Sequence, residues 1–181
     1  IFFDTTSAGN AVINTDRGVW FAGISTAANA TITGNATSNL LFDVGSNAGN
    51  ATITSNGGLI EFTGSNTAAN ATITTNSNAY LRFAGESTAG NARIINNASL
   101  VDFSRSFGPN RDQRLSVGSI EGSGRFLLGS GQVLTAGSNN RSTNVTGTIA
   151  EDNLGHAFGA TLKKVGSGTL TLSGMNSYTG A

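Results

Sequence analysis

Hydrophobic and polar residues alternate along this chain in short runs that return at a regular interval. Ala71-Thr72-Ile73-Thr74 and Leu81-Arg82-Phe83 are typical, with apolar side chains at every second position. Alternation at this period predicts short β-strands with one buried face. Clusters of Ser, Asn, Gly and Thr separate the runs, as expected for turns. The pattern therefore predicts two short strands in each unit of the chain.

Two sequence markers define an internal repeat. The first is the block Ala-(Gly/Ala)-Asn-Ala, and the second is a phenylalanine that closes each unit; both markers return with nearly the same step. The asparagines are Asn10, Asn29, Asn50, Asn70 and Asn91, and the phenylalanines are Phe3, Phe21, Phe42, Phe62, Phe83 and Phe103. A repeat of this length predicts stacked units, because no single unit can bury its own apolar face.

Stacking of these units predicts an all-β fold, a right-handed parallel β-helix (solenoid) with coils of about 20 residues. Strands of successive coils would lie ~4.8 Å apart, so that equivalent side chains form columns. Right-handedness follows the general preference of connections between parallel strands. The expected interior columns are Ala11, Ala30, Ala51, Ala71 and Ala92; Ile13, Ile32, Ile53, Ile73 and Ile94; Val19, Leu40, Ile60, Leu81 and Val101; and the phenylalanines. We expect ~8 to 9 coils and a length of roughly 40 Å.

The regularity of the repeat divides the chain into three regions. Residues 1–103 are regular repeats, and residues 116–181 contain shorter strands punctuated by glycine, which predict less regular coils. Between them, residues 104–115 (SRSFGPNRDQRL) hold the only proline and three arginines, Arg105, Arg111 and Arg114. This composition predicts a loop that protrudes from the column. Because the sequence opens and closes in mid-pattern, we expect a segment truncated at both ends.

The repeated asparagines are predicted to occupy one corner of every coil. Amide side chains stacked on their own kind can donate and accept hydrogen bonds along a column. We interpret Asn10, Asn29, Asn50, Asn70 and Asn91 as a structural asparagine ladder. Three of them, Asn29, Asn50 and Asn70, are followed by Ala-Thr, the acceptor sequence for N-glycosylation. A turn buried under small residues would leave no room for a sugar, which favours the ladder.

Two outward-facing features are candidates for binding. Thr31, Thr33, Thr52, Thr54, Thr72 and Thr74 form a Thr-x-Thr array over three coils, which resembles the ice-binding face of β-solenoid antifreeze proteins. Threonine also suits any exposed strand. The second feature is an outward column of Phe2, Trp20, Leu41, Glu61, Arg82 and Asp102. Its charged half predicts a surface charge ladder, and its apolar half predicts a patch that is covered by another segment or binds a partner.

Composition narrows the classes of partner. Ten basic and ten acidic residues give zero net charge, and only 11% of the residues are charged. Such a chain has no overall field to attract nucleic acid or an anionic membrane. Cysteine is absent, which excludes disulfides and thiolate chemistry. No apolar run reaches the ~20 residues that a membrane-spanning helix needs.

The chemistry-bearing residues do not form a recognisable catalytic set. The ten acids are scattered over different phases of the repeat, and only Glu151 and Asp152 are adjacent. General acid–base catalysis needs two such groups held together. His156 is the only histidine, so it has no obvious partner for a metal, and we expect it in a loop. We therefore predict no catalytic residue, metal, cofactor or small-molecule substrate, with a polysaccharide-acting β-helix enzyme as an alternative.

The end of the chain carries a family resemblance. The run from Lys164 to Gly180, KVGSGTLTLSGMNSYTG, resembles the passenger-associated repeat of bacterial autotransporters of the type V secretion route. The runs 119–124 and 139–143 are similar to what precedes that repeat, so the resemblance covers residues 117–181, whereas residues 1–103 do not match it. It implies a right-handed β-helix, a C-terminal outer-membrane β-barrel elsewhere in the same chain, and a location on the bacterial surface or outside the cell.

Together these patterns predict a non-catalytic stalk or adhesin segment of an autotransporter passenger. Its partners would be a host or neighbouring-cell surface, matrix or an abiotic surface. We expect the contact at Arg105, Arg111 and Arg114, or at the patch around Trp20 and Leu41. An ice- or surface-binding solenoid that uses the threonine array is the alternative.

Overall fold

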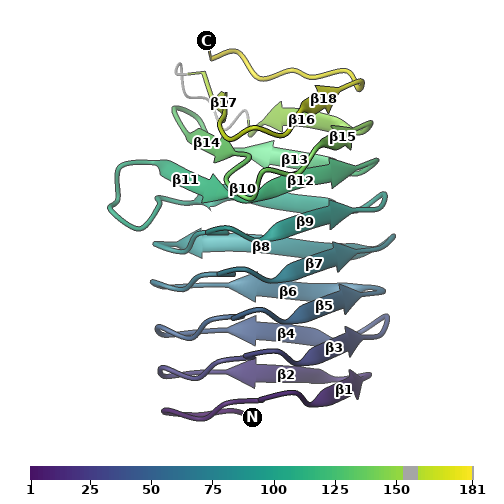
Figure 1. The fold of residues 1–181 in the computed structure, drawn as a ribbon, viewed down its shortest axis with the longest axis vertical. Helices are drawn as coiled ribbons and strands as arrows, with labels where there is room; N and C mark the ends of the chain where they lie inside the picture. The colour runs from purple at the N-terminus through teal and green to yellow at the C-terminus, as the bar shows by residue number, and fades with distance from the viewer. Residues whose placement is uncertain (153–158, 181) are drawn as a thin grey trace.

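The chain forms a β-solenoid in which parallel strands stack along one axis (Figure 1). The computed structural model describes residues 1–152 and 159–180. Over these residues there are eighteen strands and no helix. The strands make about 7 coils of roughly 21 residues each. The predicted all-β solenoid is therefore confirmed.

Two parallel sheets run the length of the column. One has eight strands: β1 (Val12–Thr15), β3 (Thr31–Gly34), β5 (Thr52–Ser55), β7 (Thr72–Thr75), β9 (Arg93–Asn96), β12 (Ser119–Gly122), β15 (Thr143–Val145) and β18 (Leu170–Leu172). The other has seven: β2 (Gly18–Phe21), β4 (Asn39–Phe42), β6 (Gly58–Phe62), β8 (Ala79–Gly85), β10 (Leu100–Ser106), β13 (Arg125–Leu128) and β16 (Thr148–Glu151). Each of the first seven coils thus contributes one strand to each of these two sheets, and β18 adds an eighth strand to the first sheet.

A third side of the column changes character along the chain. In the regular half it consists of single parallel bridges that join Ser7, Thr26, Asn47, Thr67 and Thr88. Above Thr88 it becomes a sheet of β11 (Arg114–Val117), β14 (Val133–Ala136) and β17 (Thr161–Lys164). The Thr88 hydroxyl links the two parts, because it accepts a hydrogen bond from the Ser116 amide at 3.4 Å.

The upper coils are longer than the repeat predicts. Thr72 pairs with Arg93 in the regular part, whereas Arg93 pairs with Ser119 and Val133 with Thr161, both of which are wider steps along the chain. The added strands of the third sheet use these extra residues. This explains why there are about 7 coils where the sequence predicted 8 to 9.

In the regular half, the core consists of the predicted columns of like side chains, and apolar residues of the upper coils such as Phe126 and Ile149 continue it. The isoleucines from Ile32 to Ile94 are buried, and Ile13 is half-buried in the first coil. Consecutive phenylalanine rings stack with centroids 4.5 to 5.2 Å apart and planes within 10° of parallel. Stacked rings at this spacing bury large apolar areas along the axis of the column.

The first phenylalanine of the column is Phe2, so the prediction that Phe3 lies inside and Phe2 outside was wrong. Phe2 bridges to Phe21 and stacks on its ring at 4.7 Å, while Phe3 is 55% exposed. The step from Phe2 to Phe21 equals the step from Asn10 to Asn29, which is the shortest in the asparagine series. A shift of one residue moves a side chain to the opposite face of a strand.

The predicted loop at residues 104–115 is shorter in the structure. Strand β10 continues to Ser106 and β11 begins at Arg114, which leaves residues 107–113 outside the strands. Figure 1 shows this excursion projecting from the side of the column between β10 and β11. We refer to residues 107–113 as the excursion.

Candidate functional site

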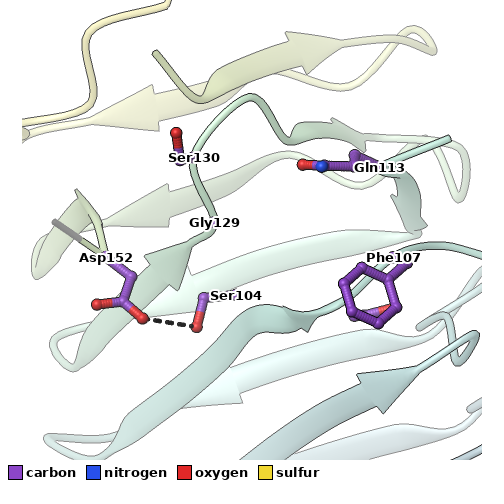
Figure 2. A pocket seen from close by; sticks show the side chains of 7 residues that line it. Ser104, Phe107, Gln113, Gly129, Ser130 and Asp152 are labelled. Atoms are coloured by element: carbon purple, nitrogen blue, oxygen red, sulfur yellow. Dashed lines mark hydrogen bonds between the residues drawn. The ribbon is translucent and has the colours of Figure 1, made fainter. Parts of the chain in front are cut away.

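A cavity of about 240 Å³ opens where the chain leaves the regular column. The excursion and the end of β10 border one part of it, and the β13–β14 turn and the residue after β16 border the rest. Its lining residues are Ser104, Ser106, Phe107, Gln113, Gly129, Ser130 and Asp152. Figure 2 shows the Phe107 ring and the Gln113 amide on one side of the cavity and Ser104 and Asp152 on the other.

A β-bulge in β10 creates the space. Asp102 pairs with Arg82, and Arg105 pairs with Ala84. Between these two pairs, β10 therefore contains one more residue than β8. A bulge redirects the side chains that follow it. Ser104 lies inside this interval, and its side chain reaches the cavity.

Backbone hydrogen bonds and one glycine define the shape of the excursion. The backbone N–H of Gln113 donates a hydrogen bond to the backbone carbonyl of Phe107 at 2.7 Å. This bond joins the two ends of the excursion. Gly108 has φ +77°, and a Cβ there would lie 2.5 Å from the Arg114 carbonyl oxygen. Only glycine fits this position. The closed excursion holds the Phe107 ring 56% exposed to solvent.

Two aspartates meet at the Ser104 hydroxyl, although they are far apart in sequence. Asp102 is only 3% exposed and accepts hydrogen bonds from the Ser104 amide, the Ser104 hydroxyl and the Tyr80 hydroxyl at 2.8, 2.6 and 2.6 Å. Asp152 Oδ2 lies 3.3 Å from the same Ser104 oxygen. A hydroxyl has one proton, and the shorter contact to Asp102 takes it. The Asp152 carboxylate therefore keeps acceptor capacity that faces the cavity.

The predicted surface charge ladder is only partly present. Glu61 and Arg82 form an ion pair at 2.5 Å, and its hydrogen bond raises the pKa of Arg82. Asp102 belongs to the same column but is buried and bonded to Tyr80 and Ser104. The expectation that Asp102 lies on the surface was wrong, because the bulged strand encloses it.

The three arginines of the predicted loop lie along the chain from the end of β10 to the start of β11, but their surroundings differ. Arg105 is exposed within β10, and Arg114 is exposed as the first residue of β11. Arg111 lies in the excursion and pairs with Glu86 at 2.5 Å. Among residues 1–152 and 159–180, no ion pair involves Arg105 or Arg114.

The apolar patch around Trp20 differs in one member from the prediction. Trp20 is 39% exposed and is paired in register with the half-buried Leu41. Ile1, which is 87% exposed, takes the outward place that was assigned to Phe2. The patch lies at the N-terminal end of the column, far along the axis from the excursion (Figure 1).

The asparagine corner is a continuous hydrogen-bonded ladder. Each amide nitrogen donates to the oxygen of the asparagine one coil earlier, at 3.1 to 3.3 Å. Its members are Asn10, Asn29, Asn50, Asn70 and Asn91. All five are exposed, so the expectation that small residues bury this corner was wrong. The flanking alanines lie inside the column and leave the amides outside.

A second ladder at another corner was not anticipated. It contains Asp16, Asn35, Asn56, Asn76 and Asn97. Asn35 donates to Asp16 at 2.6 Å, Asn76 to Asn56 at 2.7 Å, and Asn97 to Asn76 at 3.1 Å. Its members follow one another at the same steps as those of the first ladder. This equality is the sequence signal that could have revealed it.

The threonine array lies on the eight-stranded sheet in the expected register. Thr31, Thr52 and Thr72 are paired across three strands, as are Thr33, Thr54 and Thr74. Val12 precedes the first column, and Arg93, paired with Glu121 at 2.5 Å, follows it. Only the three middle coils therefore present hydroxyls in both columns.

The described residues contain no group of three or more His, Cys, Asp or Glu side chains that could hold a metal ion. His156 lies outside these residues. Within the same residues, no helix is long and apolar enough to cross a membrane. No family model, curated protein or solved structure matches the chain significantly.

Proposed function

We propose that the chain is a rigid, non-catalytic stalk and adhesin segment of an autotransporter passenger, exposed on the bacterial surface or secreted. The observation that carries this proposal is a stacked column whose side, over the described residues, is interrupted by a structured, solvent-facing excursion. In this proposal, the column holds the binding region away from the cell that displays it. The segment from the end of β10 to the start of β11 contacts the partner. The partner is a host or neighbouring-cell surface, matrix or an abiotic surface.

The dimensions and packing of the column suit a spacer. The eight strands of the longest sheet are separated by seven steps, which at ~4.8 Å each give a length of roughly 34 Å. Like side chains repeat on every coil of the regular half, so additional coils of this kind could extend the column without a new core. Parallel hydrogen bonding on two sides resists bending.

The final coil supports the resemblance to autotransporter passengers. Residues 164–180 follow the column through β18 and then cross β16, where the Ser177 amide donates to the Ile149 carbonyl at 2.9 Å. The Asn176 side chain accepts from the Ile149 amide at 2.8 Å. The run KVGSGTLTLSGMNSYTG thus occupies nearly a full coil, as a repeat that continues a passenger solenoid would.

The state of the acids supports a non-catalytic role. Asp102, the more buried of the two carboxylates near the cavity, accepts three protein hydrogen bonds and is held by Tyr80 and Ser104. Asp102 does not line the cavity, so its carboxylate does not contact a substrate bound there. We therefore propose binding and not cleavage at this region.

A charge-matched substitution experiment tests the contact. The variant R105Q/R111Q/R114Q in the full-length, surface-displayed protein removes the three arginines found from the end of β10 to the start of β11. The control variant R17Q/R125Q/R141Q removes three exposed arginines from other parts of the column. We expect the first variant to reduce cell or matrix attachment at least about fivefold and the control to leave it unchanged, because electrostatic complementarity acts locally at a contact.

Thermal unfolding of the same variants separates binding from folding. Loss of the Arg111–Glu86 surface pair should cost less than about 1 kcal/mol. If attachment survives the first triple substitution, or if both triples weaken it equally, Arg105, Arg111 and Arg114 do not form the contact.

A second candidate function is ice or surface binding by the threonine array, which the in-register pairing of six threonines favours. T52K/T54K should abolish thermal hysteresis, because two lysines interrupt both columns at their centre. V133K/T135K, on the outer face of β14, is the matched control. Hysteresis that is absent from the unmodified protein, or that survives T52K/T54K, removes this candidate.

A further inference from the structure

We infer that the cavity beside the excursion binds a single neutral sugar residue of a surface glycan. This inference rests on the proposed adhesin function and names its ligand class. The cavity combines an exposed aromatic ring, hydroxyl and amide groups, and a carboxylate with spare acceptor capacity.

The size of the cavity limits the ligand. Its volume of about 240 Å³ is below the ~300–1,000 Å³ of pockets that enclose drug-sized molecules. One ring-sized group fits, and its neighbours in a chain would continue into solvent over the open side. A terminal or protruding sugar residue meets this requirement better than a peptide segment or a free metabolite.

The lining matches the two faces of a pyranose ring. The face of such a ring is largely C–H, and this apolar surface can pack on the exposed Phe107 ring. The edge of the sugar carries hydroxyls that both donate and accept. Opposite Phe107, Asp152 Oδ2 can accept a sugar hydroxyl proton, because the Ser104 proton is committed to Asp102. The side-chain amide of Gln113 offers both a hydrogen-bond donor and an acceptor.

The site is already formed in the free protein. Buried Gln132 lies beneath it and donates to the carbonyls of Phe103 and Ser106 at 2.9 and 2.8 Å, while its oxygen accepts from the Gly129 amide at 2.9 Å. These bonds connect β10 to the β13–β14 turn across the floor of the cavity. A preformed site loses little conformational entropy on binding, which favours a small ligand.

The charge of the cavity selects against acidic sugars. Asp152 lines it and the buried Asp102 lies behind Ser104, so a uronate or sulfate group would meet two carboxylates. Arg111 is already paired with Glu86, and neither Arg105 nor Arg114 lines the cavity. We therefore assign the site to neutral hexoses or N-acetylhexosamines.

Nuclear magnetic resonance titration of the chain tests the inference. The probes are the methyl glycosides of glucose, galactose, mannose and N-acetylglucosamine, with methyl glucuronide as the acidic comparison. We expect at least one neutral glycoside to shift the amide signals of Ser104, Phe107 and Gln113, with a Kd of roughly 1–10 mM. Methyl glucuronide should bind at least about fivefold more weakly.

Matched variants identify the residues responsible. F107A and D152N should each raise the Kd at least about fivefold. Their controls are F3A, which removes an aromatic ring of equal exposure at 55%, and D43N, which removes a half-buried carboxylate elsewhere. The absence of shifts with every neutral glycoside up to about 50 mM, well above the expected Kd, overturns the inference. Binding that F107A leaves unchanged also overturns it.

The attachment assay separates this inference from the proposed function. If F107A abolishes glycoside binding but attachment of the full-length protein is unchanged, the sugar site stands and is not the adhesive contact. If no glycoside binds while R105Q/R111Q/R114Q still weakens attachment, the adhesin proposal stands and the sugar site is wrong.

Discussion

At the scale of single residues, the Tyr80–Asp102 pair connects the regular column to the cavity. The Tyr80 hydroxyl donates to Asp102 at 2.6 Å, and Asp102 in turn fixes Ser104. Burial and the hydrogen bond to Asp102 raise the pKa of Tyr80 to about 12. The folded protein thus holds the phenol proton more tightly than the unfolded chain does, and this proton keeps the Ser104 side of the cavity in place.

We predict that stability falls at high pH through Tyr80. A tyrosine in the unfolded chain loses its proton near pH 10, so between about pH 10 and 12 the folded state binds more protons than the unfolded state. The contribution of the pair is complete below pH 10 and is lost as the pH rises to about 12. After allowance for the partial exposure of the side chain, the loss is about 1 kcal/mol.

Spectrophotometric titration of the Y178F variant measures this pKa directly, because Tyr80 is then the only tyrosine. Y80F should remove the alkaline loss of stability between pH 10 and 12. A titration midpoint close to 10 would contradict the prediction.

The exposed asparagine ladder offers a second test at the residue scale. Asn50 donates to Asn29 at 3.1 Å and accepts from Asn70 at 3.3 Å. N50A removes both bonds from the middle of the ladder and should cost about 1 kcal/mol in chemical denaturation. N10A removes only the terminal bond, to Asn29, and should cost about half as much. Equal effects of the two variants would argue that the ladder hydrogen bonds do not determine the loss of stability.

At the scale of the element, the strands and their columns could be predicted because the information is local and periodic. A strict alternation places Ile53 and Phe62 inside, and the repeat places Ile73 above Ile53 in register. The same reasoning failed at the first coil, where a shorter step along the chain puts Phe2 inside in place of Phe3.

The cavity could not be predicted in this way. It depends on one extra residue in β10 and on Asp152, which reaches the site two coils later. Neither feature repeats, so periodicity contains no information about it. What the sequence did offer was Phe107, a phenylalanine that falls outside the phenylalanine column in a polar run.

The phenylalanine column gives a prediction for the strands. Phe62 is fully buried, with the rings of Phe42 and Phe83 at 4.5 and 5.1 Å on either side. F62A should lower the free energy of unfolding by about 3–5 kcal/mol, because it removes a stacked ring and leaves a cavity between two neighbours. F107A, at an exposed ring, should change it by less than about 0.5 kcal/mol. Comparable losses in guanidinium denaturation would show that the rings do not stabilise the column.

At the scale of the whole molecule, stability is distributed along one dimension. Each coil contacts the coil before and the coil after it, so a local opening need not unfold the rest. The last coil depends on Glu151, which accepts hydrogen bonds from the amides of Ala160 and Thr179 and from the Thr179 hydroxyl. These hydrogen bonds lower the pKa of Glu151, and the bond from the Thr179 amide has the largest effect. One carboxylate thus attaches two separate parts of the final coil to β16.

This arrangement predicts that acid opens the final coil before the rest of the column. Because the folded pKa of Glu151 is lowered, its contribution is complete above the unfolded value of about 4.3 and is lost as the pH falls through the folded pKa. Hydrogen-exchange protection factors of Ala160, Thr179 and Gly180 should therefore fall on acidification, while that of Thr72, deep in the regular column, should not. E151Q should lower the protection of the same three amides at neutral pH and remove its dependence on pH. If E151Q instead lowers protection at Thr72 as well, the column unfolds as one cooperative unit and the coils are not independent.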